Sequence, residues 1–350
     1  MERNSATLRG RGAGINPTSR FERLTVLSEE APASRVATEY LADTSRSVIA
    51  RNNSPDIPFD ASLNPYRGCE HGCAYCYARP SHEYLGMSAG IDFESRILVK
   101  EDAPELLRRE LASPRWTPQV LALSGVTDAY QPVEEKLGLT RRCLEVLVEA
   151  RNPVVIVTKS ARVTRDIDLL AELAMHRAAA VCLSTTTLDG DLARRLEPRA
   201  SHPRRRLAAV EKLTAAGIPC SVLMSPLIPA LTDHEIPALL QAAKDAGAVS
   251  ASYLILRLPG AVAPLFEDWL TRNVPDRREK VLNRIRALRG GRLNDPRFGM
   301  RFRGQGPFAD QIRTLFHTTR KRLGLDRSGP KLSTQSFRKP VIDQLPLFDF

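Results

Sequence analysis

Short apolar segments and longer amphipathic segments alternate along the middle of the chain. Turn-forming residues bound the apolar, β-favouring segments, which predict strands at 61–66, 120–125, 154–159, 180–187, 220–227 and 252–257. Between them, apolar residues recur at helical spacing and predict helices at about 103–112, 137–151, 166–176, 203–216 and 235–246. Pro153, Gly217 and Pro219 lie at predicted helix-to-strand joints, where such residues commonly end a helix.

Strands that alternate with helices of this length form parallel sheets joined by right-handed crossovers. Six such strands suggest either an open doubly wound sheet or a partial barrel, and we expect an α/β fold with a partial (β/α)6 barrel at residues 59–260. Residues 1–58 show no sustained period and predict an irregular N-terminal arm. Beyond the last strand, the pattern predicts a basic helical extension at 261–325 and a flexible polar tail at 326–350.

The composition is that of a globular protein with an excess of positive charge. The chain has 350 residues, 43% of them hydrophobic and 26% charged, enough to bury a large core. It has no apolar segment of about 18 residues and no signal-peptide pattern, so we expect a cytoplasmic protein that binds no membrane. Lys and Arg outnumber Asp and Glu by 51 to 40. This excess favours a polyanionic partner such as nucleic acid, although a basic soluble enzyme would also show it.

Three of the six cysteines, Cys69, Cys73 and Cys76, lie within eight residues in the pattern C-x3-C-x2-C. An odd number of clustered thiols in a reducing compartment favours metal binding over disulfides. Three thiolates can hold three irons of a [4Fe–4S] cluster and leave the fourth iron open to a substrate or cofactor. The loop follows the first predicted strand, and the loops after the strands of a parallel barrel build its active site.

A zinc site is the main alternative for this loop. Zinc takes four ligands, commonly in two closely spaced pairs, and the sequence has no second pair. Cys143, Cys182 and Cys220 are isolated in apolar segments, so we expect them to be small buried hydrophobic residues. His71 could be a fourth ligand, but it lies inside the three-residue gap of the motif, where chelation would strain the loop. We therefore favour iron–sulfur over zinc.

The cysteine motif and its context resemble the radical S-adenosylmethionine (SAM) superfamily. Within it, the segments NPYRGCEHGCAYCYARPSHEY, LSGVTDAYQPVE, VTKS and LSTTTLD are similar to the spore photoproduct lyase-related group, over about residues 58–260. The resemblance implies that the open iron chelates the methionine end of SAM. One electron from the reduced cluster then cleaves SAM to a 5′-deoxyadenosyl radical, which abstracts hydrogen from the substrate. It also implies a flavodoxin or ferredoxin as electron donor.

The resemblance also assigns roles to residues outside the cysteine motif. It places Tyr75 against the adenine of SAM and gives Tyr77 a position like that of the lyase's tyrosines near the radical path. Thr127 and Asp128, after the second strand, would accept hydrogen bonds from the SAM ammonium group. The resemblance assigns three further residues to SAM binding: Lys159, Ser184 and Arg199. Of these, Arg199 would bind the carboxylate of SAM.

One position departs from the lyase pattern. The repair enzyme of that group carries a cysteine hydrogen donor at the end of the second strand, where this chain has Gly125 and Val126. We therefore do not expect thymine-dimer reversal by the same hydrogen relay. Cys182, two residues before Ser184 on the same strand face, could replace that thiol, although core packing is the simpler explanation for it.

The leading hypothesis is a radical SAM enzyme that acts on nucleic acid in a DNA repair-like reaction. One alternative is the same chemistry on a small molecule or peptide. Another is a non-catalytic zinc or iron–sulfur DNA-binding protein, which the six-strand pattern disfavours.

The end of the sequence, VIDQLPLFDF, indicates a further partner. It is similar to the Q-L-x-L-F peptide by which bacterial repair and replication proteins dock on the sliding clamp, and the matching residues are Gln344, Leu345, Leu347 and Phe348. Apolar side chains on a polar tail favour binding in a partner's groove. The alternative is that the tail folds back onto the barrel.

Overall fold

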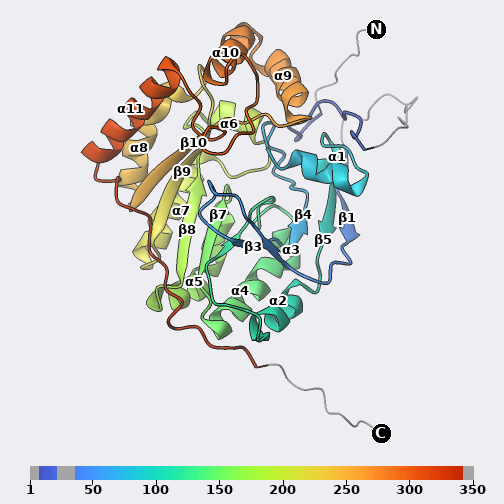
Figure 1. Cartoon of the computed structure of the whole chain (residues 1–350), viewed down its shortest axis with the longest axis vertical. Helices are drawn as coiled ribbons and strands as arrows, with labels where there is room; N and C mark the ends of the chain where they lie inside the picture. The colour runs from blue at the N-terminus through green and yellow to red at the C-terminus, as the bar shows by residue number, and fades with distance from the viewer. Residues whose placement is uncertain (1–7, 22–35, 342–350) are drawn as a thin grey trace.

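A sheet of mainly parallel strands forms the centre of the molecule (Figure 1). The structure, a computed structural model, describes residues 8–21 and 36–341. Within these residues the central sheet has seven strands in the order β10-β9-β8-β7-β6-β3-β2. Their bounds are Ile49–Arg51 for β2, Ala61–Leu63 for β3, Leu121–Leu123 for β6, Val154–Thr158 for β7, Ala179–Ser184 for β8, Cys220–Leu227 for β9 and Ser250–Ile255 for β10. Only β2 runs antiparallel to its neighbour; the strands from β3 to β10 are parallel.

The order of the parallel strands distinguishes between the two predicted architectures. From β3 to β10 they follow the chain order without reversal. A doubly wound sheet reverses its strand order at a switch point, whereas a barrel adds each strand on the same side of the last. The predicted partial barrel is therefore confirmed.

Helices lie between successive strands and cover one face of the sheet (Figure 1). The longer ones are α2 (Ala103–Ala112), α4 (Leu139–Ala150), α5 (Ile167–Met175), α7 (Pro203–Ala215) and α8 (Ile236–Asp245). They match the predicted helices to within a few residues. Shorter helices are α1 (Asp92–Ser95), α3 (Glu134–Leu137) and α6 (Gly190–Leu196).

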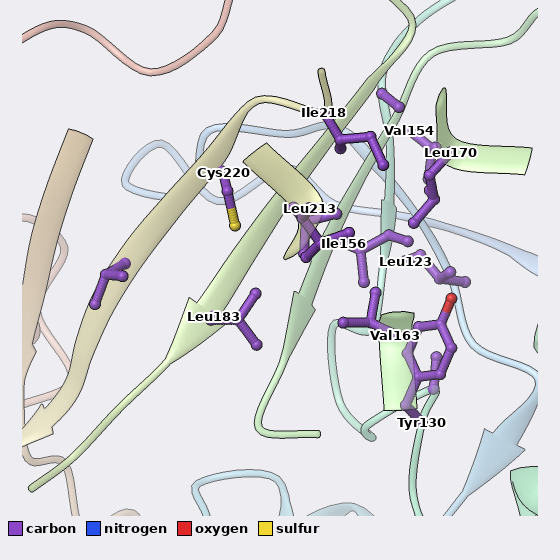
Figure 2. Close-up of a cluster of buried hydrophobic side chains, with 14 of the residues drawn as sticks. Leu123, Tyr130, Val154, Ile156, Val163, Leu170, Leu183, Leu213, Ile218 and Cys220 are labelled. Atoms are coloured by element: carbon purple, nitrogen blue, oxygen red, sulfur yellow. The ribbon is translucent and has the colours of Figure 1, made fainter. Parts of the chain in front are cut away.

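Burial alternates along the strands and separates a packed outer face from a more open inner face. In β7, Ile156 is fully buried, whereas the next residue, Val157, is partly exposed. Figure 2 shows the buried face, where Leu183 of β8 lies in one hydrophobic cluster with Leu170 of α5 and Leu213 of α7. Because side chains alternate along a strand, the partly exposed residues face the inside of the partial barrel. This inner face leads to the strand ends where the candidate site lies.

A second, three-stranded sheet has the order β1-β5-β4. Its strands are Glu39–Ala42 (β1), Arg96–Val99 (β5) and Tyr66–Arg67 (β4). The N-terminal arm thus supplies β1 to this sheet and β2 to the central one. The sequence pattern does not indicate β1 because that strand is short and largely exposed, so it has no apolar alternation.

Beyond β10 the chain continues as α9 (Val262–Asn273), α10 (Pro275–Leu288) and α11 (Pro307–Arg322). The tail then crosses to α4, where the backbone N–H of Arg338 donates to Ala150 O at 2.9 Å. The proposed clamp motif, Gln344, Leu345, Leu347 and Phe348, lies outside the described residues. In the described part of the chain, no helix has the length and apolar character needed to cross a membrane.

Candidate active site

The three clustered cysteines line one hollow at the carboxyl ends of the parallel strands. The hollow opens to solvent, and its wall includes Cys69, Cys73 and Cys76. The loop turns sharply at Gly72, whose φ of 64° lies in the left-handed region that favours glycine. A Cβ at this position would lie 2.6 Å from Glu94 Oε2. The tight loop that gathers the thiols therefore requires glycine here.

The donor set suits an iron–sulfur cluster. Burial raises the pKa of the Cys69 and Cys73 thiols, so a nearby cation is needed to stabilise their thiolates. Among the described residues, no three His, Cys, Asp or Glu side chains converge tightly enough to hold a single metal ion. In a cluster each thiolate binds a different iron, so the ligands stand further apart. Three thiols on one loop therefore fit a cluster, in which each would bind its own iron.

Thr127 and Asp128 line the same hollow, but the protein itself already engages Asp128. Its Oδ1 accepts a hydrogen bond from the Thr158 hydroxyl at 2.7 Å, and its Oδ2 accepts one from the Lys159 backbone N–H at 2.8 Å. His71 Nδ1 lies 3.3 Å from Oδ2. Burial opposes ionisation, but the contact with His71 and these hydrogen bonds hold the pKa of Asp128 well below its usual range. Asp128 thus connects His71 of the cysteine loop to Thr158 and Lys159 at the end of β7.

Lys159 and Ser184 reach the hollow from the ends of β7 and β8. Lys159 Nζ lies 5.7 Å from the centroid of the Tyr75 ring. The Ser184 hydroxyl donates to Ser225 O at 2.9 Å. The structure therefore brings a cation and a hydroxyl to the wall that carries the cysteines. Their contact with SAM stays a prediction.

Tyr75 is held by a buried polar network that the sequence did not indicate. Its hydroxyl donates to Glu197 Oε1, and Glu197 in turn pairs with Arg206. The Thr186 hydroxyl donates to the same carboxylate at 2.7 Å. Arg206 also donates to Ser184 O at 2.8 Å, which ties the network to the end of β8. The charged segment LEPRASHPRRR contains both partners, but nothing in the sequence marks them as a pair.

Three predicted site residues do not line this hollow: Tyr75 lines a neighbouring one instead, and Arg199 and Cys182 line neither. Arg199 Nη1 lies 3.2 Å from Glu70 Oε1, and its Nε donates to Gly10 O at 3.2 Å, so this side chain ties the N-terminal arm to the cysteine loop. Cys182 lies on the inner face of β8, two residues before Ser184, and burial raises the pKa of its thiol to about 12. The roles assigned to these three residues stay predictions.

Tyr77 stands at the mouth of the hollow. Its side chain is half exposed, and its hydroxyl donates to Gly125 O at 2.5 Å. Gly125 and Val126 both line the hollow, so the position at which the resemblance expects a cysteine faces the cluster loop without a thiol. Cys143 and Cys220 are fully buried, as predicted for small hydrophobic residues.

The N-terminal arm packs directly on the cysteine loop. The backbone N–H groups of Gly12 and Ala13 donate to the two oxygens of Glu94, at 3.0 and 2.8 Å. Fully buried Arg79 contacts the same carboxylate at 2.5 Å, and its Nε donates to Cys73 O at 3.0 Å. Arm, carboxylate and arginine thus form one rigid support behind the cysteines.

Comparisons with known proteins agree with this geometry. Residues 63–243, about half of the chain, match the sequence model of the radical SAM superfamily. An uncharacterised protein of Mycobacterium tuberculosis is 36% identical over 238 residues, which are 67% of this chain and 69% of that protein. An uncharacterised protein of Methanocaldococcus jannaschii is 32% identical over 173 residues, which are 49% of this chain and 62% of that protein.

Solved structures with a similar fold include those of spore photoproduct lyase. Its complex with dinucleoside spore photoproduct has a TM-score of 0.59 at 14% identity, covering 87% of this chain and 86% of that chain. A variant with bound AdoMet and the same dinucleoside has a TM-score of 0.58 at 14% identity, covering 85% of each chain. This likeness concerns the fold. The match to the sequence model, over about half of the chain, carries the assignment further: the chain belongs to the radical SAM superfamily.

Proposed function

We propose that this protein is a radical SAM enzyme whose [4Fe–4S] cluster is held by Cys69, Cys73 and Cys76. The observation that carries the proposal is that these thiols, on one glycine-turned loop, line a single hollow at the ends of the parallel strands. When bound, the cluster and SAM would supply a 5′-deoxyadenosyl radical, with one electron from a flavodoxin- or ferredoxin-type donor. The chain's own residues bind, orient and shield these groups.

Residues in and beside the hollow would provide the contacts that SAM needs. The Thr127 hydroxyl donates to Tyr66 O at 3.3 Å, which leaves its own lone pairs for an ammonium group. Lys159 offers a cation for a carboxylate and Ser184 a hydroxyl for a ribose. Tyr75, immobilised by its buried network, offers a fixed ring surface for adenine. The N-terminal arm covers the cysteine loop from behind and limits access of water and oxygen to it.

We propose further that the substrate is nucleic acid, altered in a repair-like reaction. The formal charge of +11 and the basic extension support a polyanionic substrate. The fold likeness to a lyase bound to a dinucleoside photoproduct supports it too. Because Gly125 and Val126 carry no thiol, we assign the transferable hydrogen of the reaction to Cys182 or Tyr77 instead.

The cluster assignment is tested by iron analysis after anaerobic reconstitution. Wild-type protein should hold about four irons per chain and absorb in the visible range. Changing Cys69, Cys73 and Cys76 to Ala should remove this iron, whereas the matched control Cys143→Ala should keep it. A triple variant with full iron content would reject the assignment.

The substrate assignment is tested by incubating reduced protein and SAM with oligonucleotides, followed by mass spectrometry. Single-stranded, duplex and ultraviolet-damaged DNA form one series, and peptides form the second. A SAM-dependent mass change confined to the oligonucleotides is expected. A mass change confined to the peptides would reject nucleic acid as the substrate and favour a peptide substrate.

A further inference from the structure

Arginine and aromatic side chains border the mouth of the active-site hollow. Arg257, just after β10, lines a second hollow that shares Cys76 and Tyr77 with the first. The guanidinium carbon of Arg257 lies 5.0 Å from the centroid of the Phe302 ring and 5.9 Å from that of Tyr77. The guanidinium carbon of Arg301 lies 4.7 Å from the centroid of the same Phe302 ring. Two cations thus flank one aromatic ring beside the cluster loop.

Arg257 carries a charge that the described part of the protein does not neutralise. Its Nε is buried and has no hydrogen-bond partner among the described residues. Asp56, the carboxylate that acts on it, is already bound by Arg301, whose Nε donates to Asp56 Oδ2 at 2.8 Å. Burial and the charge of Arg301 lower the pKa of Arg257. Arg257 as a whole is partly buried, so its guanidinium is partly desolvated yet can still meet an anion from solvent. A partly desolvated cation without a carboxylate of its own favours a ligand that supplies the opposite charge.

Arg289 fixes this arrangement from behind. Only 2% exposed, it donates through Nη2 to Leu256 O at 2.5 Å and to Arg301 O at 3.1 Å. These two carbonyls immediately precede Arg257 and Phe302, so Arg289 sets the spacing of the two side chains. Its Nε and Nη1 have no partner within residues 8–21 and 36–341, and burial together with Arg257 lowers its pKa to about 10. It therefore adds to the positive potential of the mouth.

We propose that Arg257 binds a backbone phosphate of the substrate, with Phe302 and Tyr77 as surfaces for the adjoining base or sugar. The proposal rests on the proposed function and deepens it, since it names a phosphodiester of single-stranded nucleic acid as the group recognised. The proposed function already gives the SAM carboxylate a cation, Lys159, so Arg257 is left for a different anion. A guanidinium recognises phosphate through paired hydrogen bonds, and aromatic rings beside basic side chains stack unpaired bases. Tyr77 links this site to the cysteines, so a phosphate here places the next nucleotide at the active-site hollow.

The test compares Arg257→Met with Arg322→Met in the full-length holoprotein. Both changes remove one arginine charge, and Arg322 is an exposed residue at the end of α11. Fluorescence anisotropy of a labelled single-stranded oligonucleotide measures binding. Arg257→Met should weaken binding about tenfold to a hundredfold, as expected for loss of a charge-assisted hydrogen bond. Arg322→Met should weaken it less than about threefold. Equal weakening by both variants, or unchanged binding by Arg257→Met, would overturn the proposal.

Neutral and free-phosphate probes identify the group that Arg257 binds. An oligonucleotide with methylphosphonate linkages should bind the wild type and Arg257→Met alike, because it lacks the charge in question. A preference of the wild type for this neutral probe would contradict the proposal. Millimolar inorganic phosphate should displace little of the charged oligonucleotide. Complete displacement would show a site for a small phosphate ligand instead of a backbone phosphate.

Thermal melting separates a ligand-binding arginine from a structural one. Removal of this partly buried, uncompensated charge should leave the melting temperature unchanged or raise it. A lowered melting temperature of Arg257→Met, together with equally weakened binding by the charge-preserving Arg257→Lys, would show a structural role and overturn the proposal. Iron content and SAM cleavage of the wild type report the proposed function separately. A protein without a cluster that keeps Arg257-dependent binding would refute the proposed function but not the phosphate site.

Discussion

Replacing Arg206 with methionine tests the buried network that fixes Tyr75. The side chains of Arg206 and Glu197 are each only 1% exposed and form a direct ion pair. Methionine fills much of the arginine's space but removes the direct ion-pair partner of Glu197. Removing one partner of a buried pair costs about 3–5 kcal/mol of unfolding free energy. The arginine's hydrogen bonds to Ser184 O and Ser201 O, at 2.8 and 2.7 Å, are lost as well.

The sign of the pH dependence follows from Glu197. Burial opposes its ionisation, but Arg206, assisted by Lys159 and the hydrogen bond from Tyr75, lowers the pKa of Glu197 below its usual value. The wild-type carboxylate therefore stabilises the fold above its unfolded pKa, and this contribution is lost as pH falls through the folded value. Without Arg206, burial dominates and the pKa of Glu197 rises. The difference in stability between wild type and Arg206→Met should be largest near pH 7 and shrink toward pH 4.

The assay is urea unfolding, followed by circular dichroism, of the wild type, Arg206→Met, Glu197→Gln and the double variant. Because the double variant contains no unpaired charge, it should be clearly more stable than the sum of the single changes implies. We expect an interaction energy of about 2 kcal/mol or more. Additive losses, with an interaction energy below about 0.5 kcal/mol, would refute the description of a coupled buried pair.

Three further predictions concern the arm, the mouth and the tail. A Cβ on Gly12 would lie 1.8 Å from a carbonyl oxygen of the cysteine loop, so Gly12→Ala should loosen the arm and speed loss of visible absorbance in air, relative to the open-site control Gly329→Ala. Despite its burial, hydrogen bonds from Arg301 lower the pKa of Asp56 to about 2. In thermal melts, the stability advantage of wild type over Asp56→Asn should therefore be full above about pH 4 and vanish between pH 4 and pH 2. Truncation after Asp343 should abolish binding to a purified bacterial sliding clamp, and binding that survives it unchanged would reject the Q-L-x-L-F assignment.

The barrel was predictable because its signals are local. Strands such as 154–159 and helices such as 203–216 are recognised from the spacing of apolar residues within one segment. Whether the sheet closes as a partial barrel or winds in both directions depends on strand order, which a local pattern does not contain. The strand β5 and the exposed strand β1 escaped prediction for a related reason. Their pairing joins residues far apart in the chain, and neither segment has a strong period of its own.

In the candidate site, too, the local features were predictable from the sequence and the contacts between distant residues were not. The cysteine motif is compact in sequence, so its spacing alone indicates a metal centre. The contact between Tyr75 and Glu197 joins residues 122 positions apart, and no pattern in the sequence connects them. The sequence likewise singled out Arg199 from its arginine-rich loop, whereas the structure places Arg206 in the network beside the hollow. Which of several neighbouring arginines reaches a site depends on the helix that carries it.

The most direct test of the central claim is chromatography of reduced protein incubated with SAM. With an intact cluster and dithionite as reductant, the wild type should release 5′-deoxyadenosine slowly even without substrate. The variant lacking Cys69, Cys73 and Cys76 should release none. If the wild type holds its cluster, binds SAM and still forms no 5′-deoxyadenosine, the assignment of radical SAM chemistry to this site is contradicted.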